Sequence, residues 1–136
     1  MSNALLFILV PIIGYICLWL LGIVLFLAYF RLFKIPLDMK HPVSMIKKLP
    51  SYLAVATVPV CSFVSFFITT KAVTSAFALT LPAVQLFWIG LVSLFVTVTL
   101  DILITVVGEK VDIRTFPVNL MYVLAWLVII PAVILA

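Results

Sequence analysis

The stretch Ser93–Pro117, SLFVTVTLDILITVVGEKVDIRTFP, decides how this chain folds. It begins inside a long apolar run, carries the acid Asp101 within that run, and ends in a short charged loop. At about 100° per residue, one sector of a helix through this run collects the small and polar residues Gly90, Ser93, Thr97, Asp101, Thr105 and Gly108. Leu, Val, Phe and Trp cover the remaining surface, so we expect this polar stripe to face protein or water rather than lipid.

The composition of the whole chain places it outside the range of soluble proteins. Of 136 residues, 68% are hydrophobic and 9% are charged, and the mean hydropathy is +1.50. Soluble domains are about 45–50% apolar and about 25% charged. Charged residues separate the uncharged runs Ser2–Phe30, Leu49–Thr70, Ala72–Leu100 and Thr115–Ala136. Each run exceeds the roughly 20 residues that a helix needs to cross about 30 Å of hydrocarbon.

These runs predict an all-α integral membrane protein with four transmembrane helices in a compact bundle. Only helices and closed barrels satisfy the backbone hydrogen bonds in lipid, and the runs lack the alternating pattern of barrel strands. Residues 1–136 are expected to form a single domain, because the helices leave no room for a soluble one. The helices are expected at residues 4–30, 51–70, 81–107 and 117–136.

Residues near the ends of the runs refine this assignment. The first run has no basic residue before it and is too long for the apolar core of a secretory signal, so we interpret it as a retained helix. A short turn is expected from Lys71 to Thr80. Pro82 suits the first turn of the third helix, and Gly108 is expected to close that helix.

The distribution of Lys and Arg predicts the orientation of the chain. Cytoplasmic loops of membrane proteins carry an excess of these residues. The first connection holds Arg31, Lys34, Lys40, Lys47 and Lys48, the third holds Lys110 and Arg114, and the second holds Lys71. We therefore expect cytoplasmic first and third loops, extracytoplasmic termini and a plasma (inner) membrane location. The net charge of +4 then reflects topology and requires no nucleic-acid partner.

The first connection, residues 31–50, mixes basic with apolar residues and is broken by proline. Such a segment is expected along the membrane surface, with apolar side chains among the headgroups and basic ones near anionic lipid. His41 has only Asp38 as a potential ligand nearby, so we interpret it as a solvated loop residue.

No motif in the chain indicates a cofactor, a metal site or a catalytic centre. Cys17 and Cys61 lie near the middle of their runs and are not arranged as a CxxC pair. We interpret both as buried apolar residues and expect no disulfide bond between them.

The polar stripe is the candidate functional site. The proposed substrate or ion pathway consists of Asp101, Thr97, Thr105, Ser93 and Asn119. Possible partners at the cytoplasmic rim are Glu109, Asp112, Arg114, Arg31 and Lys47. An acid within a membrane needs a partner or water, and it commonly marks an ion or proton path. The alternative is a structural acid that forms a salt bridge or a cap and holds the helices together.

Three classes of function remain open on this basis. The first is a transporter or permeation protein that uses Asp101 as a proton or cation site, expected as a homo-oligomer because four short helices enclose little pathway. The second is an accessory subunit of a larger membrane complex, in which the stripe serves helix association. The third, and the weakest, is a lipid-modifying enzyme at the cytoplasmic face, because one acid and scattered basic residues form no catalytic spacing.

Overall fold

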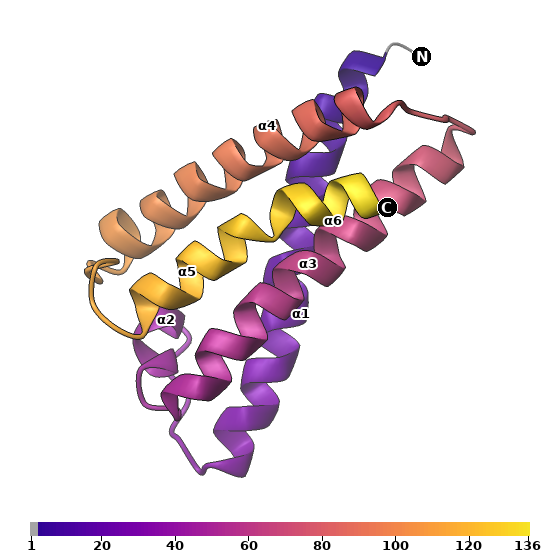
Figure 1. Ribbon diagram of the computed structural model, residues 1–136. Coiled ribbons are helices and arrows are strands. Elements are labelled where there is room, and N and C mark those ends of the chain that lie inside the picture. Colours follow the sequence, from indigo (N-terminus) through magenta and orange to yellow (C-terminus); the bar gives the residue numbers. More distant parts are fainter. Residues whose placement is uncertain (1–2) are drawn as a thin grey trace.

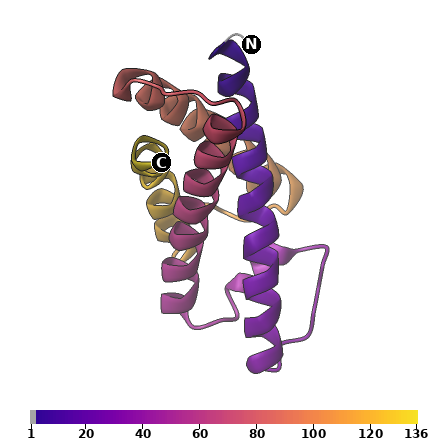
Figure 2. The same cartoon turned by 90° about the vertical axis from the view of Figure 1, so that its right-hand side faces the viewer.

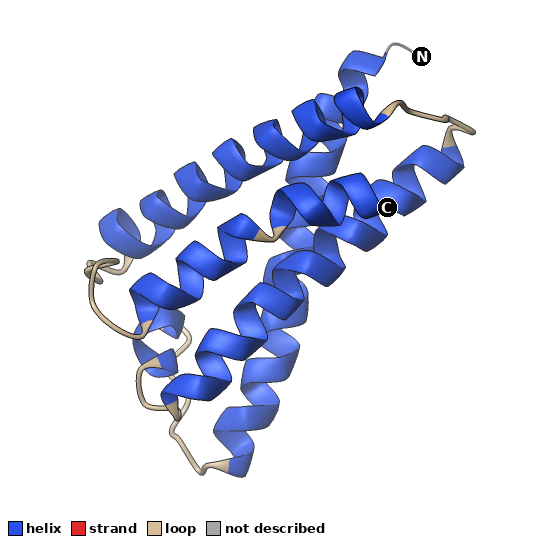
Figure 3. Cartoon of the chain, in the orientation of Figure 1, coloured by secondary structure: helices blue, strands red, loops and turns tan. Residues whose placement is uncertain are grey.

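The computed structural model describes residues 3–136, and the secondary structure of these residues is helical (Figure 3). A short 3-10 helix, Asn3–Leu5, precedes the first long helix. The elements that follow are α1 Leu6–Leu32, α2 Pro42–Ile46, α3 Ser51–Ala76, α4 Ala83–Ile102, the π-helix Leu103–Gly108, α5 Val118–Leu127 and α6 Ile129–Leu135.

Four helical segments are long and apolar enough to cross a membrane. They are Leu6–Leu32, Ser51–Ala76, Ala83–Gly108 and Val118–Leu135. The prediction of four helices long and apolar enough to span a membrane is therefore confirmed, and this architecture is that expected of a multi-pass membrane protein.

The helices pack side by side, and α3 contacts most of the others. It packs along α1 and against both α5 and α6, while α4 packs against α1 and α6 (Figures 1 and 2). Helices α4 and α5 make few contacts with each other. We call the end that carries α2 and the loop 109–117 the loop end, and the opposite end, where the chain starts and finishes, the terminal end (Figure 1).

The predicted end of the second span at Thr70 is wrong, because α3 continues through Lys71 to Ala76. The Lys71 ammonium lies 5.6 Å from the centroid of the Phe67 ring one turn earlier. A lysine can rest its aliphatic stem and charge on an apolar helix in this way, so its presence does not end the helix. The chain turns after Ala78, which has a φ of 49°, and the Leu79 N–H donates to the Thr74 carbonyl.

The third span changes its winding after Ile102. Residues 103–108 form a π-helix, in which the hydrogen bonds join residues five apart. Helical structure does end at Gly108, but the left-handed residue of the cap is Lys110, with a φ of 55°. The Val111 N–H then donates to the Thr105 carbonyl at 3.0 Å, which closes the helix. The wider winding also turns Gly108 outward, so it is exposed and leaves the buried stripe.

The fourth span is interrupted at Val128, between α5 and α6. Pro131 explains the interruption, because it has no N–H to donate to the Leu127 carbonyl and its ring crowds that carbonyl. The chain nevertheless keeps its direction, since the Ala132 N–H donates to the Val128 carbonyl at 3.0 Å.

The apolar core has a separate part at each end. The terminal core consists of Leu6, Val10, Phe66, Val73, Ile89, Ile129, Ala132 and Val133. The loop core consists of Phe26, Phe30, Val43, Met45, Ile46, Leu49, Ala54, Val111, Val118, Met121 and Tyr122. Val43, Met45, Ile46 and Leu49 thus pack inside the protein, whereas the sequence predicted apolar side chains of this connection among the headgroups. The short helix α2 explains the difference, because it turns its apolar side toward α1, α3 and α5.

Candidate functional site

Asp101 lies on α4 among side chains from three helices, with 3% of its surface exposed. The Tyr15 hydroxyl, on α1, donates a hydrogen bond of 2.9 Å to Oδ1 of the carboxyl group. The indole N–H of Trp126, on α5, donates a hydrogen bond of 2.8 Å to Oδ2. One carboxyl group therefore connects α1, α4 and α5.

Aromatic rings and a hydroxyl group surround this connection. Tyr122 stacks on Trp126 with 5.8 Å between the ring centroids. The Tyr122 hydroxyl is also hydrogen-bonded to the Thr105 hydroxyl at 2.7 Å. The Trp19 ring meets Tyr15 edge to face at 6.4 Å. The acid thus sits in an aromatic environment that excludes bulk water.

Both groups that bind Asp101 are neutral. In the part of the chain that the structure describes, the salt bridge formed is between Arg114 and Asp112, which are exposed. A buried carboxylate paired with a buried base would leave an uncompensated cation when it became protonated, and that costs several kcal/mol. Protonation of Asp101 leaves no such charge behind. The site is therefore suited to gain and lose a proton.

The polar stripe continues from Asp101 in both directions along the third span. Ser93, Thr97 and Thr105 are buried, with at most 1% of each residue exposed. The stripe was expected to face protein or water; its residues from Gly90 to Thr105 are buried against protein, and Gly108 is exposed. The hydroxyl groups of Ser93 and Thr97 have no hydrogen-bond partner within residues 3–136. Positions four residues apart are separated by about 6 Å along a helix, a distance that one water molecule can bridge.

Helix α3 adds further polar groups to the interior. Ser62 donates to the Ala125 carbonyl at 2.8 Å and joins α3 to α5. Ser65 and Thr70 are buried, and their hydroxyl groups lack a partner among the described residues. Such hydroxyls usually bind backbone or water, so these two groups remain available for hydrogen bonding inside the protein.

The structure does not bring the remaining predicted residues to Asp101. Asn119 is half-buried and its Oδ1 accepts a hydrogen bond from the Leu120 N–H at 2.7 Å. Arg31 is exposed at the end of α1. The Lys47 ammonium donates to the Thr115 hydroxyl at 3.2 Å and so links the first connection to the third.

Glu109 connects the same two loops from the end of the third span. Its Oε2 accepts hydrogen bonds from the backbone N–H groups of Val43 at 3.0 Å and Ser44 at 3.4 Å. Burial raises the pKa of Glu109 above its ordinary value, and these two N–H groups partly oppose the rise. The backbone N–H of Arg114 lowers the pKa of the exposed Asp112.

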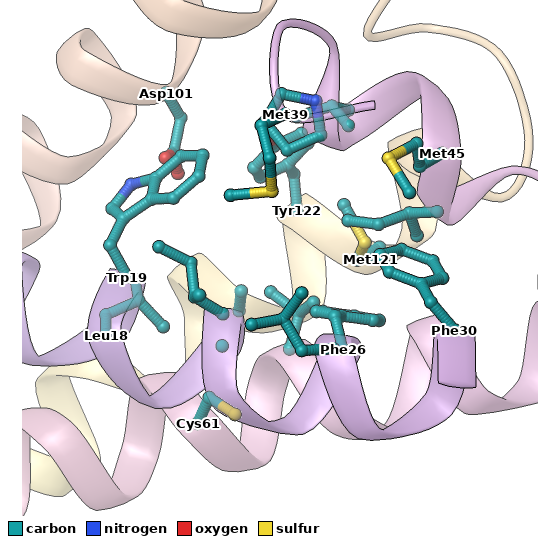
Figure 4. Close-up of a pocket in the computed structure, with 18 residues that line it drawn as sticks. Leu18, Trp19, Phe26, Phe30, Met39, Met45, Cys61, Asp101, Met121 and Tyr122 are labelled. Atoms are coloured by element: carbon teal, nitrogen blue, oxygen red, sulfur yellow. The ribbon is translucent and has the colours of Figure 1, made fainter. Parts of the chain in front are cut away.

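An apolar pocket opens next to Asp101. It lies between α1, α3 and α5, and α2 with the loop before it covers the loop end. The pocket has a volume of about 90 Å³. In Figure 4, Asp101 and Trp19 lie at one end, and Met45, Met121 and Phe30 lie at the other. Among the described side chains that line the pocket, only Asp101 carries a charge.

Sequence reasoning missed Tyr15 and Trp126 as partners of the acid. A signal was present, because a Tyr hydroxyl or Trp N–H far from the membrane surface still needs an acceptor. Asp101 is the only acid within the four predicted spans.

The donor chemistry of the described residues indicates no metal site, since no group of three or more His, Cys, Asp or Glu side chains gathers among them. Cys17 and Cys61 are free thiols. Comparison with known proteins finds no matching family model, no similar curated protein and no similar solved structure. The inference of function therefore rests on the site.

Proposed function

We propose that this protein is a small membrane transport protein for protons, in which Asp101 takes up and releases a proton inside the membrane. The observation that supports this is the buried carboxyl group held by two neutral donors, Tyr15 and Trp126. A metal cation is a weaker candidate, because no group of three or more His, Cys, Asp or Glu side chains gathers among the described residues.

The stripe supplies groups that can relay the proton. On the side toward the terminal end are Thr97 and Ser93, whose hydroxyls are free to bind water. On the side toward the loop end is the hydrogen-bonded pair of Thr105 and Tyr122. Glu109 follows the last residue of the third span at the loop end. Its Oε1 atom is buried and has no hydrogen-bond partner among residues 3–136. Chains of acids and hydroxyls of this kind carry protons in membrane proteins.

We further propose an orientation of the chain and a membrane in which it resides. The loop end faces the cytoplasm and both termini face outward, because seven of the eight Lys and Arg residues lie in the first and third connections. The protein resides in the plasma membrane, and the basic side chains of residues 31–50 contact anionic lipid headgroups. It assembles as a homo-oligomer, since one copy encloses little pathway.

Proton flux into liposomes tests the proposal. Purified protein is reconstituted with an entrapped pH dye, and a pH gradient with a balancing potassium flux drives the protons. Asp101→Asn keeps the size of the side chain but cannot titrate, so we expect flux to fall at least about tenfold, as for loss of an essential proton site. Asp112→Asn removes the same charge from an exposed loop and should leave flux unchanged.

Thermal unfolding and size-exclusion profiles of both variants show whether they fold and assemble. A folded Asp101→Asn variant with the flux of the unsubstituted protein would refute the proposal. The stripe would then be a surface for helix packing, and the accessory-subunit class would become the better explanation.

A further inference from the structure

The pocket beside Asp101 differs at its two ends. Most of its wall consists of Leu, Ile, Val, Phe and Met side chains. One end presents the carboxyl group of Asp101 with the rings of Trp19 and Tyr122 nearby (Figure 4). The pocket is thus a single apolar chamber with one acidic, aromatic end.

These two surfaces favour one ligand chemistry. The apolar wall excludes water and accepts a hydrocarbon body. An ionised carboxylate attracts a cation, and the faces of Trp and Tyr rings attract it further. An anionic ligand would be repelled by Asp101. A neutral one would bury the carboxylate more deeply without compensating its charge.

We propose that this pocket binds a monovalent organic cation with an apolar tail, such as an alkylammonium ion, with its charged head against Asp101. The inference rests on the proposed function in one respect, because the cation and the proton use the same carboxyl group. When the cation binds, Asp101 releases its proton, so one positive charge replaces another at the site. Binding alone requires only that the carboxyl group be ionised.

The dimensions of the pocket restrict the ligand. A volume of about 90 Å³ is smaller than the roughly 150 Å³ of an engineered cavity that binds benzene. It holds the charged head and the first carbons of a chain. The rest of the chain extends past the pocket residues that reach the surface, among them Ile23 and Met39, which are 36% and 63% exposed. Methionine side chains such as Met39, Met45 and Met121 adapt readily to ligands of different shape.

Gly22 offers a way to fill the pocket without touching Asp101. It lines the pocket, and a Cβ atom added to it would have no neighbouring atom within 4 Å. Gly22→Leu therefore starts a side chain in open space at the wall of the chamber. Val24 is 65% exposed and does not line the pocket, so Val24→Leu introduces the same residue on the outer face of α1 as a control.

Calorimetric titration of the protein in lipid nanodiscs tests the inference with three probes of equal chain length. Octylammonium should bind saturably, and octanoate should not bind. Octanol should bind at least about tenfold more weakly than octylammonium, because it forms neither the ion pair with Asp101 nor a cation–π contact. Gly22→Leu should weaken octylammonium binding at least about tenfold, and Val24→Leu should leave it unchanged. Asp101→Asn should abolish the preference for octylammonium over octanol.

The outcomes separate this inference from the proposed function. Equal binding of octylammonium and octanoate, or undiminished octylammonium binding by folded Gly22→Leu protein, would overturn the pocket assignment even if the unsubstituted protein conducts protons. Selective octylammonium binding by a protein that shows no proton flux would uphold the pocket and refute the proposed function. Thermal unfolding of each variant establishes that a loss of binding does not reflect misfolding.

Discussion

The glycines in the two halves of the molecule differ in the space around them. At the terminal end, a Cβ atom on Gly14 would lie 2.5 Å from the Phe66 ring, and one on Gly90 would lie 3.2 Å from the Ile130 Cα atom. Toward the loop end, the corresponding space at Gly22 is open. Small residues therefore bring helices together in one half of the molecule and leave a chamber in the other.

Asp101 lies where the packing changes from one kind to the other. Helix α4 packs closely on α6 but makes few contacts with α5, and the acid bridges this looser region through Trp126. A site that must admit a proton or a ligand requires such a region, whereas the closely packed half holds the helices in place. The following substitutions test whether the two halves differ as described.

The largest effect is expected from Gly14→Leu. The new side chain collides with the Phe66 ring, which is fully buried. Overpacking of this kind should lower the free energy of unfolding by about 3 kcal/mol. Gly22→Leu should change it little. Equilibrium unfolding in mixed micelles measures both, and equal losses in the two variants would contradict the proposed difference between the halves.

A smaller loss is expected from Asp101→Leu. The substitution leaves the Tyr15 hydroxyl and the Trp126 N–H without their acceptor, which should cost about 1–3 kcal/mol of unfolding free energy. Tyr15→Phe added to this variant should recover part of the loss, because one unpartnered donor is removed. Thr97→Val is the control, since its hydroxyl has no partner among residues 3–136. Equal stability of Asp101→Leu and the unsubstituted protein would show that the carboxyl group does not hold the helices.

The smallest effect is expected from Glu109→Ala at the loop end. Loss of the hydrogen bonds to the Val43 and Ser44 N–H groups should cost about 1 kcal/mol. Hydrogen exchange of these amides should also become faster. Asp112→Ala, in the exposed loop, serves as the control for removal of an acid. Unchanged exchange at Val43 in the Glu109→Ala variant would mean that the contact does not order α2.

The four long apolar helices and the common face of the polar residues were predictable from sequence, because each depends on a single helix. Apolar length predicts a span, and the spacing of Ser93, Thr97 and Asp101 predicts a common face. The end of α3 was missed, because a lysine that follows an apolar run predicts a loop. The Lys71 side chain instead lies over the Phe67 ring, and the helix continues. The π-helix that turns Gly108 outward was also missed, because the spacing of polar and apolar residues does not indicate it.

The partners of Asp101 were not predictable in the same way, because they depend on how helices rotate against one another. Tyr15 and Trp126 come from spans far apart in the sequence. Charge alone suggested Arg31, Lys47 or Arg114 as partners. Long basic side chains near the ends of spans instead extend toward the membrane surface, and all three residues are exposed.

Infrared difference spectroscopy of the purified protein between acid and alkaline pH tests the central claim most directly, because the chain contains only four acids. Neutralising the other three, as Asp38→Asn, Glu109→Gln and Asp112→Asn, leaves Asp101 as the sole titrating side-chain carboxyl group. We expect this variant still to gain a protonated-carboxyl band on acidification, and the band to disappear when Asp101→Asn is added. A spectrum without a band that depends on Asp101, from protein that remains folded, would contradict the claim that this carboxyl group exchanges a proton within the membrane.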